Sequence, residues 1–205
     1  MNDLKVTISK GNSKMGAIPS VSLPPIITCP AGAPCAAKCY AAKICRLYAN
    51  VKQSYYNNLD VLNSDWGEYW RQVRGAVSMT KYFRFHVAGD IPNAAYFKEM
   101  VITAKQNPGT RILAFTKRYE IVNNYIDVFG DLPENLIIIF SMWDAVWNIS
   151  IHNPHDLPLS AVIFKGVKNQ LEYTKICGGN CAECACQGVG CWEIKKGEII
   201  AFYEH

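Results

Sequence analysis

The chain has 205 residues, of which 50% are hydrophobic and 12% aromatic, enough for one packed domain that does not depend on disulfides. Its net charge is +4, and Lys and Arg are spread along the chain, so charge alone leaves nucleic acid open as a partner without indicating it. No run of about 18 apolar residues occurs, and the first residues lack the apolar core of a signal peptide. We therefore expect a single domain over 1–205, without a membrane span and cytoplasmic in location.

The N-terminal third is predicted to change from loop to helix. Residues 1–28 favour loops and short extended pieces, because Gly and Pro recur there. From about 36 to 62 the composition is helical, without Gly or Pro. Apolar side chains at helical spacing predict a further helix over 66–77.

The middle of the chain alternates between strand-like and helix-like segments. The predicted strands are 82–89, 110–117, 135–143 and 161–166, with helices over 94–107 and 119–130. Such alternation predicts βαβ units and a mainly parallel sheet. Because four strands are too few for a closed eight-stranded barrel, we expect an open or partial-barrel α/β sheet over 80–170. A cysteine-rich lobe over 173–205 follows, ending in a last strand over 198–203.

Nine cysteines form two groups, one on each side of this α/β middle. The N-terminal cysteine group is Cys29, Cys35, Cys39 and Cys45, and the C-terminal cysteine group is Cys177, Cys181, Cys184, Cys186 and Cys191. In a reducing cytoplasm, clustered thiols bind metal or act in catalysis more often than they form disulfides. We therefore expect metal-binding segments within 1–45 and 173–205.

Spacing selects three ligands in the N-terminal group. Cys35 and Cys39 are four residues apart at the head of the predicted helix, which places them on one face, one turn apart. Cys29 precedes them in a Pro- and Gly-rich loop, whereas Cys45 lies about 120° further round the helix and is expected to pack. Three thiolates on a 4Fe-4S cluster leave one iron open to a small molecule.

The C-terminal group carries one C-x2-C pair and no nearby histidine. Short cysteine spacings are common in iron–sulfur proteins, whereas zinc sites usually show two such pairs or paired histidines. We expect Cys177, Cys181, Cys184 and Cys191 as ligands, with Cys186 spare. Iron–sulfur is favoured, zinc stays the alternative metal, and the spacing leaves open whether one cluster or two is bound.

Polar residues follow the predicted strands at the position where open α/β sheets bind ligands. Asp90, Lys117 and Ser141 stand at these strand ends. Period-two alternation predicts that Arg84 and His86 share one face of their strand. Arg84, His86, Asp90 and Lys117 are therefore candidate cofactor-binding residues. Two plainer interpretations stay open: Asp90 caps the next helix, and His86 is a buried core histidine.

Several short motifs occur in an order that resembles the phage gene 88 product family, first named from mycobacteriophages. They are NSKMG (12–16), SLP (22–24), TCP (28–30), CAAKCYA (35–41), RFHVAGD (84–90), FTK (115–117) and a terminal C-x2-C with CW (191–192). The resemblance covers most of the chain and implies a phage or prophage origin, but supplies no reaction. With that origin, the cytoplasm is that of an infected bacterial host.

The chain is also similar, more loosely, to radical S-adenosylmethionine enzymes, which carry three cysteines in a C-x3-C-x2-C motif on a partial α/β barrel. Here Cys29, Cys35 and Cys39 have C-x5-C-x3-C spacing, and Tyr40 follows the third cysteine instead of preceding it. The similarity implies S-adenosylmethionine as a cofactor, with the VAGD segment (87–90) as the glycine-rich strand end.

Two functions follow from these features. The first is a phage iron–sulfur protein, enzymatic in the radical S-adenosylmethionine manner, acting on an unknown small molecule. The second is a non-enzymatic protein, stabilised by iron–sulfur or zinc, that senses redox state or binds a host protein or nucleic acid. An iron that exchanges a ligand would favour the first, and full four-thiolate ligation the second.

Overall fold

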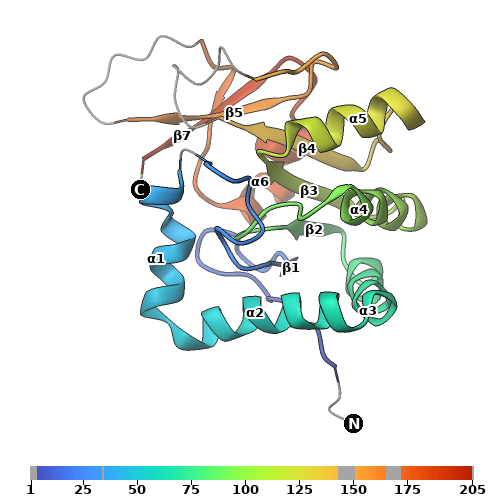
Figure 1. The fold of residues 1–205 in the computed structure, drawn as a ribbon. Coiled ribbons are helices and arrows are strands. Elements are labelled where there is room, and N and C mark those ends of the chain that lie inside the picture. The colour runs from blue at the N-terminus through green and yellow to red at the C-terminus, as the bar shows by residue number, and fades with distance from the viewer. Residues whose placement is uncertain (1–3, 34, 143–150, 165–171, 205) are drawn as a thin grey trace.

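The computed structural model describes residues 4–33, 35–142, 151–164 and 172–204. One open parallel sheet runs through it in the order β1-β2-β3-β4-β5-β7-β6 (Figure 1). The strands are β1 (Ser20–Val21), β2 (Tyr82–Phe85), β3 (Arg111–Thr116), β4 (Leu136–Ser141), β5 (Leu159–Ile163), β6 (Lys175–Ile176) and β7 (Ile199–Tyr203). The predicted open, parallel α/β sheet is confirmed.

The central strands form where apolar runs are longest. β4 has the sequence LIIIFS, and its first five residues are buried, as expected for a parallel strand covered on both faces. The two-residue strands β1 and β6 were not predicted, because two residues show no periodicity. The last residue of the predicted strand 135–143 and the last two of 161–166 lie outside the described residues.

The helices are α1 (Tyr40–Leu47), α2 (Ala49–Ser64), α3 (Trp66–Ser78), α4 (Ala94–Gln106), α5 (Tyr119–Phe129) and α6 (Cys181–Gln187), with 3₁₀ turns η1 (Ala36–Lys38) and η3 (Gly190–Glu193). The prediction of one helix over 36–62 is wrong. Extended backbone at Cys39 (ψ 113°) and Tyr48 (φ −127°, ψ 101°) divides it into η1, α1 and α2. In the described part of the chain, no helix is long and apolar enough to cross a membrane.

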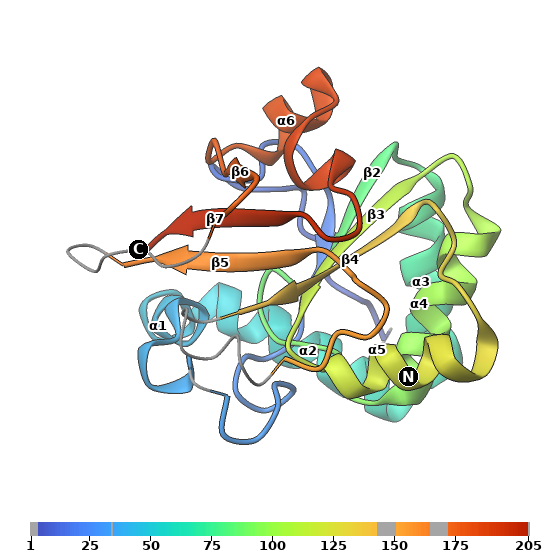
Figure 2. The same ribbon diagram turned by 90° about the horizontal axis from the view of Figure 1, so that it is seen from above.

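The sheet separates two apolar cores. The larger core lies between the sheet and the helices of one side, where Phe83 and Phe85 of β2 pack with Trp70 and Tyr96. The other face carries α6, η3 and the loop that contains Met15. Figure 2 shows α6 on one side of the sheet and α1 to α5 on the other. The C-terminal cysteine group therefore covers a sheet face.

Candidate functional site

A buried carboxylate joins the carboxyl ends of β2 and β3. Asp90 Oδ1 accepts a hydrogen bond from Thr116 Oγ1 at 2.6 Å, and Asp90 Oδ2 accepts one from the Lys117 backbone N–H at 2.9 Å. Lys117 Nζ extends this network to β4 by donating to Ser141 Oγ at 2.7 Å. Three of the predicted strand-end residues therefore lie in one network. Burial raises the pKa of Asp90, and these hydrogen bonds oppose the rise.

Asp90 does not cap the helix that follows it. The N-cap of α4 is Asn93, whose Oδ1 accepts from the Tyr96 N–H at 2.9 Å. Asp90 instead accepts the N–H of Ile91 at 2.7 Å. The capping interpretation is therefore wrong, and the carboxylate holds strand ends together.

The N-terminal cysteine group lies beside this network. The Asp90 N–H donates to Thr28 Oγ1 at 3.1 Å, and one Arg118 nitrogen donates to the carbonyl oxygens of Thr28 (3.1 Å) and Cys29 (3.0 Å). Burial is the main cause that raises the pKa of Cys29 to about 11. The charges of Asp90, Cys35 and Cys39 raise the pKa of Cys29 further.

The helical geometry assumed for Cys35 and Cys39 is wrong. They stand at the two ends of η1, and Cys39 is the N-cap of α1, with its sulfur 3.4 Å from the Ala42 nitrogen. Cys45 lies within α1, where burial and the charge of Cys39 raise its pKa. Cys29 therefore lies in a loop, and Cys35 and Cys39 stand at the starts of η1 and α1.

Arg84 and His86 lie on opposite faces of the sheet, so the prediction that they share one is wrong. β2 ends at Phe85, and His86 adopts a left-handed backbone (φ 58°), which interrupts the alternation. The buried imidazole turns toward the helices, with Nε2 3.2 Å from the Tyr96 hydroxyl, which lies 2.9 Å from the Tyr69 hydroxyl. The core interpretation of His86 is the one that matches the geometry.

Arg84 faces the C-terminal cysteine group. Its guanidinium carbon lies 4.9 Å from the Phe115 ring centroid, and Nη1 lies 3.9 Å from Met15 Sδ and 4.0 Å from Cys181 Sγ. Its Nε is buried and has no hydrogen-bond partner among the described residues. Within the same ranges, no ion pair within 4.0 Å includes Arg84. The positively charged Arg84 side chain therefore lies against sulfur atoms of Met15 and Cys181 instead of a carboxylate.

Four of the five C-terminal cysteines gather on this face. Burial is the main cause that raises the pKa of Cys191 to about 12, and the charges of Cys177, Cys181 and Cys184 act in the same direction. Arg84 opposes them. Cys186 is exposed. The four neighbouring thiols are the four that the spacing selects.

The lobe that carries these thiols is anchored to the amino-terminal parts of β2 and β3. The Tyr82 hydroxyl donates to the Ala185 carbonyl at 3.0 Å, and the centroids of the Tyr82 and Trp192 rings lie 4.9 Å apart. Arg111 donates to the Trp192 carbonyl and pairs with Glu193 at 3.2 Å. These contacts fix the lobe on the sheet.

The NSKMG segment (12–16) supports α6 from the N-terminal side of the chain. The Cys181 N–H donates to the Lys14 carbonyl at 2.9 Å, and Met15 is buried. A Cβ on Gly16 would lie 2.4 Å from the Ala182 Cβ, so only glycine fits there. The motif is therefore a support for the C-terminal cysteine group.

Sequence reasoning missed other residues of the strand-end network. The Tyr119 hydroxyl donates to the Ser141 carbonyl at 2.5 Å, and the Tyr40 hydroxyl donates to the Val87 carbonyl at 2.6 Å. Arg118 and Tyr119 come directly after Lys117 at the end of β3, so the strand-end rule that selected Lys117 would have found them as well. Tyr40 had no such signal, since its partner lies 47 residues further along the chain.

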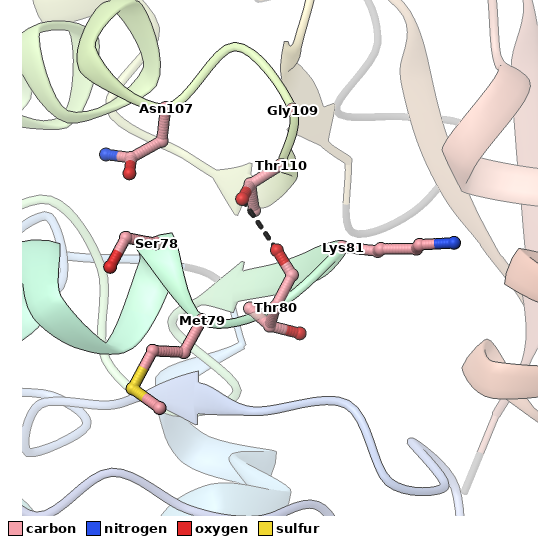
Figure 3. Close-up of a pocket in the computed structure, with 7 residues that line it drawn as sticks. All are labelled: Ser78, Met79, Thr80, Lys81, Asn107, Gly109 and Thr110. Carbon is pink, nitrogen blue, oxygen red and sulfur yellow. Dashed lines mark hydrogen bonds between the residues drawn. The ribbon is translucent and has the colours of Figure 1, made fainter.

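A hollow of about 420 Å³ without a cysteine in its lining lies at the amino-terminal ends of β2 and β3 (Figure 3). Thr110 Oγ1 donates to the Thr80 carbonyl within it at 2.6 Å. Its lining residues are Ser78, Met79, Thr80, Lys81, Asn107, Gly109 and Thr110. Without a thiol, carboxylate or imidazole, this lining offers little chemistry.

Among the described residues, no group of three or more His, Cys, Asp or Glu side chains forms a ready metal site. Metal binding by the two cysteine groups therefore stays a prediction. Searches of curated proteins and of solved structures gave no match to the chain. Residues 2–188 do match a family described as "Gene product 88", so the chain belongs to this phage gene 88 family, as its motifs indicated.

Proposed function

We propose that the protein is an iron–sulfur protein whose N-terminal cysteine group, through Cys29, Cys35 and Cys39, holds a 4Fe-4S cluster with one open iron. The observation that carries the proposal is the position of Cys29 at the carboxyl ends of the parallel strands, where Asp90 bonds the preceding Thr28 and Arg118 bonds the Cys29 carbonyl. Open α/β sheets bind their ligands at this edge. A small molecule would meet the open iron there, and S-adenosylmethionine is the candidate.

The donor sets of both cysteine groups fit such centres. Thiolates are the usual ligands of iron–sulfur clusters, and the pKa of Cys29 and that of Cys191 are each raised in part by neighbouring thiols. Mutual repulsion of this kind is relieved when a metal binds the thiolates. A bound cluster would supply electron transfer, or Lewis acidity at an open iron.

The chain's own residues have distinct tasks at the N-terminal site. Asp90 is a positioning residue, since two of the three hydrogen bonds that its oxygens accept come from Thr116 and Lys117 at the end of β3. Lys117 offers an ammonium group that donates to the neutral Ser141 hydroxyl. An ammonium can donate three hydrogen bonds, so Lys117 is suited to bind a carboxylate of the ligand.

The C-terminal cysteine group would hold an auxiliary centre through Cys177, Cys181, Cys184 and Cys191. A cluster with four thiolates carries net negative charge, which is costly to bury without a counter-charge. Arg84 supplies a positive charge 4.0 Å from Cys181 Sγ and lacks a carboxylate partner among the described residues. Its placement supports an anionic centre over the sheet.

Metal and sulfide analysis of anaerobically purified protein tests the proposal. Cys29→Ala, Cys35→Ala and Cys39→Ala should each lose the iron of the N-terminal site, whereas Cys45→Ala should keep it. Electron paramagnetic resonance of the reduced protein should change on addition of S-adenosylmethionine. Equal iron loss in Cys45→Ala would contradict the three-ligand assignment.

Other outcomes would lead to the second function. Iron and sulfide with a spectrum that does not respond to S-adenosylmethionine would indicate a redox or structural cluster without an open iron. Zinc without sulfide would contradict both clusters and leave a zinc-stabilised binding protein.

A further inference from the structure

Acidic side chains are absent from a long N-terminal stretch of the sequence. Residues 4–59 contain seven of the 21 Lys and Arg residues and none of the 17 Asp and Glu residues. The rest of the chain therefore has 14 basic and 17 acidic residues, which makes it slightly negative. The positive net charge of the protein comes from this stretch, which includes α1 and most of α2.

Basic and aromatic side chains meet on the outer surface of α1 and α2. We define the α1–α2 surface by six exposed residues: Lys43, Arg46, Leu47, Tyr48, Lys52 and Tyr56. The two helices meet at one corner of the molecule, joined at Tyr48 (Figure 1). Lys52 Nζ lies 5.7 Å from the Tyr56 ring centroid on α2, and Lys43 and Arg46 are exposed on α1. The surface therefore spans both helices.

The cations of this surface lie beside exposed large side chains. Leu47 is 62% exposed and Tyr48 is 54% exposed. Within the described residues, no ion pair within 4.0 Å includes Lys43, Arg46 or Lys52. Cations without counter-charges and rings open to solvent are left available to a partner.

We propose that the α1–α2 surface binds single-stranded nucleic acid, with its cations on phosphates and its tyrosine rings stacked on bases. Positive charge interleaved with exposed aromatic rings is the arrangement that single strands require. A duplex would use the cations but would not present base faces to Tyr48 and Tyr56. A membrane surface would require a broad apolar helix face, whereas Leu47 is the one aliphatic side chain among the six residues of the surface.

Fluorescence anisotropy with a labelled 20-nucleotide oligo(dT) tests the proposal on the intact protein. The double variant Lys43→Gln, Lys52→Gln should weaken binding about tenfold. The slope of log K against log salt should become less steep by about 1.4, at about 0.7 for each phosphate that is no longer neutralised. The matched control is Lys105→Gln with Lys195→Gln, two lysines outside the α1–α2 surface that are also exposed. The control has the same net charge and should bind within about twofold of the wild type.

The contribution of the rings is tested separately from charge. Tyr48→Leu should weaken binding about fivefold or more, because stacking on a base is removed, whereas Tyr48→Phe should bind as the wild type does. Equal weakening by both lysine pairs would overturn the proposal, as would a duplex that binds as tightly as oligo(dT). Competition by poly-glutamate as effective as by unlabelled oligo(dT), or binding to anionic vesicles without binding to oligo(dT), would also overturn it.

The proposal is independent of the cysteine ligands. None of the six residues is a proposed metal ligand, so iron content should be unchanged in every variant of the surface. Cys29→Ala should bind oligo(dT) as the wild type does, because the cations that contact phosphate are still present. The two proposals can therefore fail separately.

Discussion

His86 combines a left-handed backbone with a buried side chain. Its φ of 58° is rare for a residue other than glycine. This backbone conformation costs about 1–3 kcal/mol, so it persists only where the surrounding structure holds it. The aromatic core holds it here, since the imidazole centroid lies 5.4 Å from the Tyr96 ring centroid and Nε2 faces the Tyr96 hydroxyl. Burial, together with the charge of Arg84, lowers the pKa of His86 from 6.5 to about 3.

This shift predicts a decrease of stability in mild acid. Between pH 6.5 and about 3 the unfolded chain binds a proton that folded His86 does not, so stability is complete above pH 6.5 and falls as the pH falls. We expect the free energy of unfolding to decrease by about 2 kcal/mol between pH 6.5 and 5, at about 1.4 kcal/mol per pH unit. Urea titrations at a series of pH values measure this.

His86→Asn is the control, because Asn tolerates the left-handed backbone and does not titrate. The pH dependence over this range should be weaker in the variant by the full amount predicted for His86. The same slope in both proteins would show that other groups cause it. The two proteins are compared between pH 6.5 and 5, which lies above the range in which most carboxylates titrate.

At the scale of elements, α6 depends on a loop near the start of the chain. Gly16 combines a φ of 62° with direct contact to Ala182, whereas Gly32 has a φ of 71° and nothing within 4 Å of the position that a Cβ would take. The two glycines therefore separate the cost of backbone strain from the cost of contact. This makes the docking of α6 measurable.

Gly16→Ala should lower the free energy of unfolding by about 2–4 kcal/mol, because strain and overpacking add. Gly32→Ala should cost only about 1–2 kcal/mol, from strain alone. Adding Ala182→Gly should recover at least about 1 kcal/mol of the Gly16→Ala decrease. Thermal or urea unfolding measures each variant, and additive effects in the double variant would mean that the loop and α6 do not touch.

The sequence predicts regular elements well and their interruptions poorly. The apolar runs of β3 and β4 and the amphipathic helices α3, α4 and α5 carry strong periodic patterns. The break at Tyr48 has no Gly or Pro to mark it, and the strand end at His86 has a residue that seldom adopts positive φ. The cysteine spacing selected the four C-terminal thiols that pack in one cluster. That Arg84 and His86 lie on opposite faces could not be predicted, because it depends on the backbone conformation at His86.

At the scale of the whole molecule, the two cysteine groups occupy different parts of the sheet. The N-terminal group lies beside Asp90 at the carboxyl ends of strands, and the C-terminal group lies over a face, against Arg84. The thiols that raise the pKa of Cys29 and of Cys191 each belong to their own group. This arrangement favours two separate centres over one shared cluster.

If the proposed clusters bind, the iron content should therefore fall in steps. Replacing Cys29, Cys35 and Cys39 together by Ala should remove about half of the iron, and replacing Cys177 and Cys184 should remove the other half. Iron and sulfide analysis, with circular dichroism as a check on folding, measures both variants. Complete loss of iron from either folded variant would mean that one cluster is shared.

The order of strands in the sheet has a consequence for synthesis of the protein. From β1 to β5, the order in space follows the order in the chain, so each new strand can add to an edge that already exists. β7 departs from this order because it inserts between β5 and β6, its partners on either side. The C-terminal cysteine group lies in the connection between β6 and β7. The sheet is therefore completed only after β7 has left the ribosome, when the N-terminal half has had time to form.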